Sequence, residues 1–88
     1  MNNTNIIILS PDTSNVSLAI MESIWNIVKS KMGDSPLQHI FTLNPKIRKY
    51  QISVWVSELQ YTERIKLLES ITKNVGVTIE YISTKVEV

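Results

Sequence analysis

The chain contains a single histidine, His39, the side chain whose ordinary pKa lies closest to neutral pH. A histidine that acts as a general base needs a carboxylate to orient its ring and a pocket to hold the substrate. No Asp or Glu lies within several positions of His39, and the residues around it predict a β-strand. We therefore expect an ordinary strand histidine and not a catalytic one.

The other residue types that carry chemistry are few. There is no cysteine and no second histidine, so we expect neither a disulfide nor a metal site. The two glycines are too few for a glycine-rich phosphate loop, and no serine lies in a nucleophile-elbow motif. The sequence predicts a protein that is not an enzyme and holds no cofactor.

The charges are unevenly distributed, although the net charge is only +1. Residues 1–28 carry two acids and no base, whereas residues 29–49 carry five bases and one acid. A hairpin end rich in bases beside the N-terminus of a helix would attract an anion. The candidate residues are Ser14, Lys46, Arg48 and Lys49, with Lys73 expected at the same end. The alternative is a solvated hairpin beside ordinary helix-capping residues.

Hydrophobic periodicity predicts the elements that position these side chains. Expected strands are Asn5–Leu9, Leu37–Leu43, Lys49–Ser57 and Val75–Tyr81, and expected helices are Asn15–Met32 and one that begins between Ser57 and Thr62. This order is βαββαβ, an α+β arrangement typical of the ferredoxin-like sandwich. Right-handed crossovers would give a four-stranded antiparallel sheet of order 4-1-3-2, with both helices on one face. We expect one domain spanning residues 1–88.

The first helix carries more apolar surface than one sheet face requires. Its two apolar stripes lie side by side over roughly 200° of the helix, whereas a docked helix needs a face a little over about 100° wide. The stripes are Val16, Ile20, Ile24 and Ile27, and Leu18, Met21, Trp25, Val28 and Met32. Packing between the helices could absorb this surplus. The alternative is a protein interface formed by Met21, Trp25, Val28 and Met32.

The open face of the sheet is a second candidate surface. Trp55 falls among polar residues of its strand, and Ile40 and Ile82 would share that face if their strands keep register. RNA-recognition modules of this topology stack bases on two or three aromatic residues of the central strands. Here Trp55 stands alone, so nucleic-acid binding is the less favoured interpretation.

The sequence therefore predicts a small non-enzymatic protein-interaction module, expected to form a homodimer and to regulate or inhibit a protein partner. Small accessory or mobile-element proteins that bind and block a larger protein complex fit this description. The alternative is binding of nucleic acid or an anionic ligand at the basic hairpin end. No long apolar run or basic leader indicates a membrane span or a signal peptide, so we expect a cytoplasmic protein without a membrane partner.

Overall fold

The computed structural model describes residues 2–32 and 39–85, and these form four strands and two helices. The elements are β1 (Asn2–Leu9), α1 (Asn15–Met32), β2 (His39–Asn44), β3 (Lys49–Ser57), α2 (Tyr61–Thr72) and β4 (Thr78–Lys85). The bounds predicted for α1 and β3 are confirmed. Both segments have a strong period, of about 3.6 residues in α1 and of two in β3, which explains the agreement.

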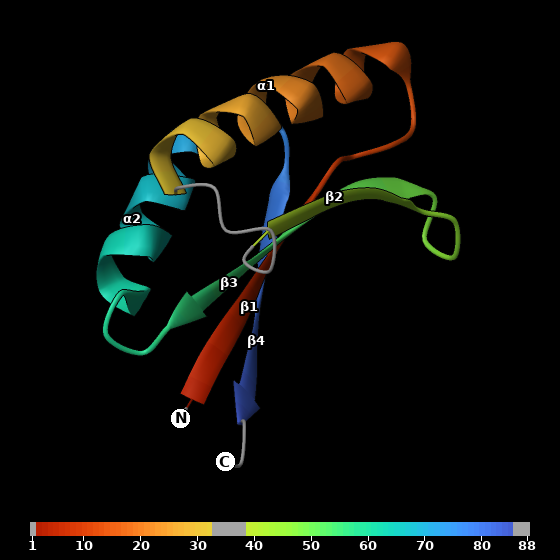
Figure 1. Cartoon of the computed structure of the whole chain (residues 1–88). Helices are drawn as coiled ribbons and strands as arrows, with labels where there is room; N and C mark the ends of the chain where they lie inside the picture. The colour runs from red at the N-terminus through yellow and green to blue at the C-terminus, as the bar shows by residue number, and fades with distance from the viewer. Residues whose placement is uncertain (1, 33–38, 86–88) are drawn as a thin grey trace.

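The strands form one antiparallel sheet of order β2-β3-β1-β4, as predicted. The aliphatic β1 and the regular β3 are the central strands, and β2 and β4 are the edges. Both helices lie on the same side of the sheet (Figure 1), and the start of β1 lies beside the end of β4, where Asn2 pairs with Lys85. The fold is therefore the predicted α+β sandwich.

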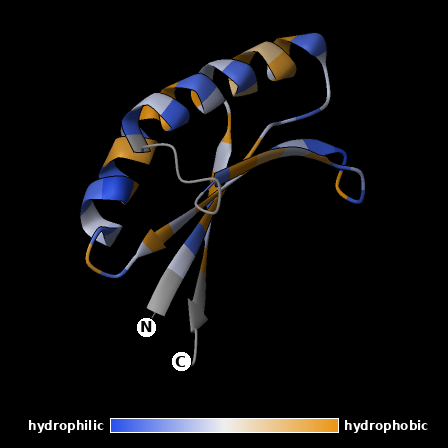
Figure 2. Ribbon diagram, viewed as in Figure 1, coloured by the Kyte–Doolittle hydropathy of each residue, from blue (hydrophilic) through white to orange (hydrophobic). Residues whose placement is uncertain are grey.

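The core lies between the helices and the sheet face that they cover, which we call the inner face. Alternate strand residues point to this face, and the central strands supply most of its buried side chains. The fully or nearly fully buried core residues are Ile6, Ile8, Met21, Ile24, Val28, Ile52, Val54, Val56 and Leu68. Figure 2 shows hydrophobic residues alternating with polar ones along the strands and helices. This single layer of aliphatic side chains holds the sandwich together.

The two helices begin differently. Ser14 caps α1, because its Oγ accepts a hydrogen bond from the backbone N–H of Ser17 at 3.2 Å. The cap position of α2 is Gln60, whose side chain makes no capping hydrogen bond. The Ser57 hydroxyl donates to Oε1 of Gln60 at 3.4 Å. The helix begins at Tyr61, within the predicted range of Ser57 to Thr62.

Other predicted strand boundaries change, and β2 ends at Asn44 and not at Leu43. β1 begins at Asn2 and not at Asn5, because its polar first residues still pair with β3 and β4. β4 begins at Thr78, three residues later than expected, and continues to Lys85. Gly76 has φ +73°, the left-handed conformation that glycine tolerates, and this turn delays the strand. The predicted start of β2 at Leu37 and the helix cap at Gly33 lie outside the described residues.

Candidate functional site

The apolar surplus of α1 is resolved mainly by burial within the chain. Met21 and Val28, predicted to be interface residues, are both 0% exposed and belong to the core. This corrects their assignment to a surface. The inner face of the sheet, together with Leu68 of α2, covers more of the apolar surface of α1 than we expected one sheet face to cover. The side chain of Met32 lies outside the described part of the chain.

Trp25 is half-buried, because it packs on the edge strand β2. Its ring lies 5.1 Å from the ring of His39 in a T-shaped arrangement and 5.8 Å from the ring of Phe41, centroid to centroid. The Nζ of Lys29 lies 5.7 Å from the Trp25 centroid on the solvent side, within cation–π range. The tryptophan is thus an extension of the core toward β2, with a lysine over its outer surface.

His39 belongs to this aromatic packing. Its Nδ1 is buried and has no hydrogen-bond partner among the described residues. No carboxylate contact to His39 is present in the described ranges, and within those ranges no cluster of three or more His, Cys, Asp or Glu could hold a metal ion. The geometry gives His39 a role in packing against Trp25.

The opposite side of the sheet, which we call the outer face, carries no helix in the described structure. The strand register assigns to it the alternate residues Asn5, Ile7, Leu9, Ile40, Thr42, Asn44, Lys49, Gln51, Ser53, Trp55, Ser57, Thr78, Glu80 and Ile82. Leu9 and Ser53 are buried even so. Lys49 and Glu80 are the charged members of this described set. The outer face is therefore nearly neutral.

Four apolar side chains, one from each strand, cross the outer face in a zigzag between two adjacent rows. Asn5 pairs with both Trp55 and Ile82 in one row of the sheet, and Ser53 pairs with Ile7 and Ile40 in the next row. Diagonal neighbours on a sheet lie about 7–8 Å apart, within reach of large side chains. Ile40, Trp55, Ile7 and Ile82 thus form a continuous line, which we call the apolar strip.

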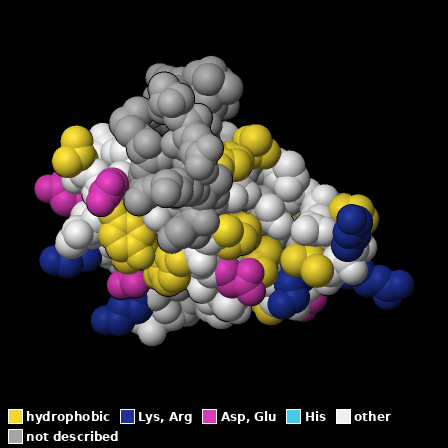
Figure 3. Space-filling model, turned by 90° about the horizontal axis from the view of Figure 1, so that it is seen from below, with side chains coloured by type: hydrophobic (Ala, Val, Ile, Leu, Met, Phe, Trp, Pro, Cys, Tyr) yellow, Lys and Arg dark blue, Asp and Glu magenta, His cyan; other side chains and the backbone are white. Residues whose placement is uncertain are grey.

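The apolar strip is accessible. Ile40 and Ile82, at its two ends, are 46% and 48% exposed, and Trp55 and Ile7 between them are half-buried. Figure 3 shows this side of the molecule, where hydrophobic side chains cross the middle and Lys and Arg side chains lie toward the margins. The grouping of Trp55 with Ile40 and Ile82 was predicted, whereas Ile7 was missed. Ile7 lies in the unbroken run Ile6–Leu9, which predicts burial on both faces.

Polar groups border the apolar strip. Asn44 Nδ2 donates to Gln51 Oε1 at 3.1 Å, and Gln51 Nε2 donates to Ser53 Oγ at 3.0 Å, which forms a ladder from β2 into β3. Asn5, between Trp55 and Ile82, has a buried Oδ1 without a hydrogen-bond partner in the described structure.

The expected anion site at the start of α1 contains an anion of its own. Asp12 Oδ1 accepts hydrogen bonds from the Ser14 backbone N–H at 2.9 Å and from the Ser17 hydroxyl at 2.6 Å. Hydrogen bonding by Ser14, followed by that of Ser17, lowers the pKa of Asp12 from 3.8 to about 2. A carboxylate thus already offsets the positive end of the helix, and Ser14 is occupied as its cap.

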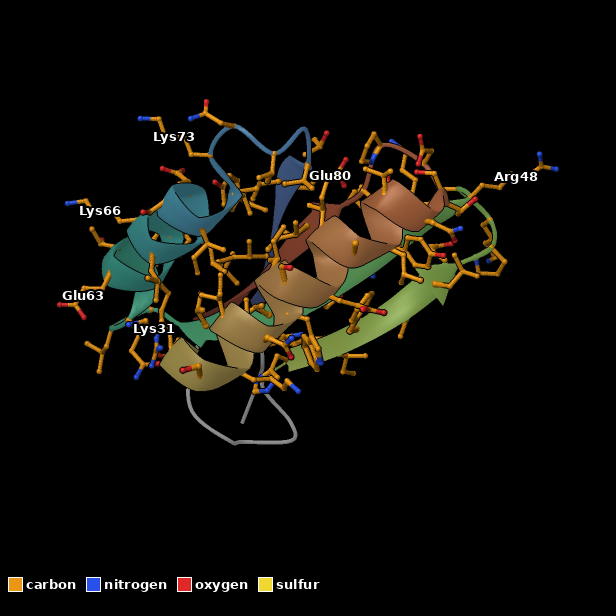
Figure 4. The ribbon with its side chains drawn as sticks, turned by 90° about the horizontal axis from the view of Figure 1, so that it is seen from above. Lys31, Arg48, Glu63, Lys66, Lys73 and Glu80 are labelled. Carbon is orange, nitrogen blue, oxygen red and sulfur yellow. The ribbon has the colours of Figure 1, made fainter. Side chains whose placement is uncertain are left out.

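The basic residues gather less closely than expected. The Ser10 loop does adjoin the start of β3, since the Tyr50 backbone N–H donates to Ser10 Oγ at 2.8 Å. Lys46 and Arg48 are exposed in the β2–β3 hairpin and Lys49 is half-buried. Lys73 was expected beside them, but Figure 4 shows Arg48 and Lys73 on opposite sides of the molecule. The four bases therefore do not form one cluster, because the full width of the sheet separates Lys73 from the hairpin.

Comparison with protein-family models and with curated protein sequences finds no match to this chain. In the described residues, neither helix has the length and apolarity that crossing a membrane would require.

Proposed function

We propose that this chain is a non-enzymatic protein-interaction module that forms a homodimer through the outer face of its sheet. The observation that supports this most directly is the apolar strip, which crosses all four strands. Water-exposed apolar groups in a continuous line favour association, because contact with a second surface removes them from water. In this proposal the homodimer also regulates or inhibits a different protein.

The composition of the outer face suits an identical copy. A twofold interface places the same surface on both sides, so a face with many like charges would repel itself. The described residues of this face include one base, Lys49, and one acid, Glu80. Two copies therefore meet with little electrostatic penalty, and the amide ladder of Asn44 and Gln51 offers hydrogen-bonding groups beside the apolar contact.

The size of the outer face sets the expected strength. Four strands about 4.8 Å apart and about 20 Å long give a footprint of about 400 Å². Two such faces pressed together would remove about 800 Å² from solvent, below the about 1,200 Å² at which stable specific interfaces begin. We expect a dimer that forms at concentrations from about 10 to about 500 µM rather than a permanent one.

Sedimentation velocity over that concentration range tests the proposal. The wild type should show a rising dimer fraction, and Ile82→Glu and Trp55→Glu should each remain monomeric, because a buried unpaired carboxylate is costly. Leu59→Glu is the matched control, since Leu59 is 98% exposed and lies outside the outer face. Its dimer fraction should equal that of the wild type. A wild type that stays monomeric at the highest concentration contradicts the proposal, as does a Leu59→Glu variant that loses the dimer.

The alternative, nucleic-acid or anionic-ligand binding at the hairpin, has weaker support. Asp12 supplies the negative charge at the start of α1, and Lys73 lies away from Arg48. The aromatic side chains Phe41, Tyr50 and Trp25 pack against the core and are not presented on the outer face for base stacking.

A further inference from the structure

The outer edge of β2 is the less protected of the two sheet edges. In the described structure β2 pairs with β3 alone, so one side of its backbone has no strand partner. Natural edge strands are usually blunted by charged residues, proline or a bulge, because a bare edge accepts another strand. The segment His39–Asn44 contains no proline and no Lys, Arg, Asp or Glu. The other edge, β4, carries Glu80 in its middle and Lys85 at its end.

Side chains on both faces of β2 would contact an added strand. Leu43, on the inner face, is 54% exposed, and Ile40, on the outer face, is nearly as open. A strand that pairs with β2 places its own side chains opposite these residues, one set on each face. Alternating apolar and small polar residues in the middle of the added strand would therefore suit this edge.

The ends of β2 are both flanked by bases. Lys29 lies over Trp25, whose ring contacts His39 at the first residue of β2. At the other end, the Lys46 backbone N–H donates to Asn44 Oδ1, and Arg48 extends outward from the same hairpin (Figure 4). Asp12 follows Ser10, whose Oγ accepts a hydrogen bond from Tyr50 beside the hairpin, and its carboxylate is held in the cap of α1.

We infer that the β2 edge binds an extended segment of a different protein, with acidic residues at both ends, which joins the sheet as a fifth strand. Backbone hydrogen bonds would supply affinity, and the flanking acids would pair with Lys29, Lys46 and Arg48. A second copy fits this edge poorly. Antiparallel pairing of two β2 strands would bring the basic hairpin of each copy toward Lys29 of the other, and these like charges would repel. This site shares Ile40 with the apolar strip of the outer face, but it does not depend on the proposed dimer.

An acetylated and amidated peptide of sequence EDVTITVDE is a suitable probe, titrated into the ¹⁵N-labelled full chain. We expect shifts and slowed hydrogen exchange of backbone amides in His39–Asn44, with a Kd on the order of 100 µM. Two further peptides carry N-methyl groups on alternate backbone nitrogens, one set on each edge of the peptide. The set that blocks the pairing edge should abolish binding, and the other should not.

Charge variants test the flanking contacts. Lys46→Glu combined with Arg48→Glu should weaken peptide binding about tenfold at low salt, because both contacts become repulsive. Lys66→Glu combined with Lys73→Glu makes the same charge change on the far side of the molecule (Figure 4) and should alter the Kd less than about twofold. The variants Ile82→Glu and Trp55→Glu, which remove the proposed dimer, should still bind the peptide.

Several results would overturn the inference. These are the absence of shifts in β2 at about 1 mM peptide, equal binding by both N-methylated peptides, or equal binding by a peptide with lysines in place of its acids. Intermolecular contacts between the β2 strands of two copies would also overturn it, since the occupant would then be a second copy. Loss of the outer-face dimer with peptide binding intact contradicts neither this site nor its occupant.

Discussion

The inner and outer faces of this sheet are built from the same strands but meet different surroundings. On the inner face, Ile6 and Ile52 are fully buried beneath α1 and α2. On the outer face, Ile7 lies one residue from Ile6 but remains half-exposed to water. Ile6 and Ile7 have the same side chain, so the difference in their exposure follows from the face to which each points and from the helices that cover the inner face.

The two tryptophans make the same contrast. Trp25 and Trp55 are both half-buried, yet Trp25 contacts the rings of His39 and Phe41, whereas Trp55 lies in the apolar strip beside Asn5 and Ile40. The burial of Trp25 completes a contact within the chain. The exposure of Trp55 leaves apolar surface available to another molecule. The two tryptophans are thus partly buried for different reasons, and the free energies of unfolding of variants at the two positions can separate these reasons.

The largest expected difference is between neighbouring isoleucines of β1. Ile6→Ala should lower the free energy of unfolding by about 3–4 kcal/mol, because it leaves a cavity beneath the helices. Ile7→Ala should cost about 1 kcal/mol, since its site is already half open to water. Urea unfolding at low protein concentration, followed by circular dichroism, measures both. Equal losses would mean that the outer face is as closely packed as the inner face.

The tryptophans should differ in the same direction. Trp25→Ala should lower the free energy of unfolding by about 2–3 kcal/mol, because it removes the aromatic contacts between α1 and β2. Trp55→Ala should lower it by about 1 kcal/mol or less while reducing the dimer fraction. Urea unfolding and sedimentation velocity on the same two variants separate the effects. A Trp25→Ala variant of unchanged stability would show that the contact with β2 contributes little.

Much of the fold was predictable, because the local patterns of α1, β1 and β3 agree with the tertiary arrangement. The regular alternation in Tyr50–Val56 and the aliphatic run Ile6–Leu9 correctly predicted the central strands and hence the sheet order. The edge strand β4 was placed too early, since Val75 and Val77 extend the apolar pattern although Gly76 adopts a turn conformation. Local hydrophobicity does not distinguish a packed turn from a strand.

The candidate surfaces were predicted less well, because they depend on what covers each residue. The apolar stripe of Met21 and Val28 indicates a wide buried face, but one sequence does not reveal how much of it α2 and the sheet will cover. Ile7 carried a usable signal, since its parity with Trp55 follows once the β1–β3 register is known. Hydrophobic periodicity does not predict the Asp12 contacts at the start of α1, because these contacts depend on the loop conformation.

Substitutions at the starts of α1 and α2, the helices that cover the inner face, should have smaller effects on the free energy of unfolding. Ser14→Ala should lower the free energy of unfolding by about 1 kcal/mol, because the backbone N–H of Ser17 loses its acceptor. Gln60→Ala, at the uncapped start of α2, should change it by less than about 0.5 kcal/mol. Urea unfolding compares the two. Similar losses would mean that the Gln60 side chain stabilises α2 through contacts other than a cap.

The smallest expected effect is the pH dependence of the Asp12 contacts. The pKa of this carboxyl is lowered from 3.8 to about 2 in the folded chain, so the ionised form is favoured by folding. Its stabilising contribution is therefore present above the unfolded pKa of 3.8 and is lost as the pH falls toward 2. Asp12→Asn should melt at a lower temperature than the wild type near pH 6, and the gap should narrow as the pH is lowered through this range. Because the two proteins differ at this residue alone, the difference in Tm isolates Asp12. A gap that stays constant with pH would mean that the carboxylate charge contributes nothing to the α1 cap, and the helix would then owe its start to Ser14 alone.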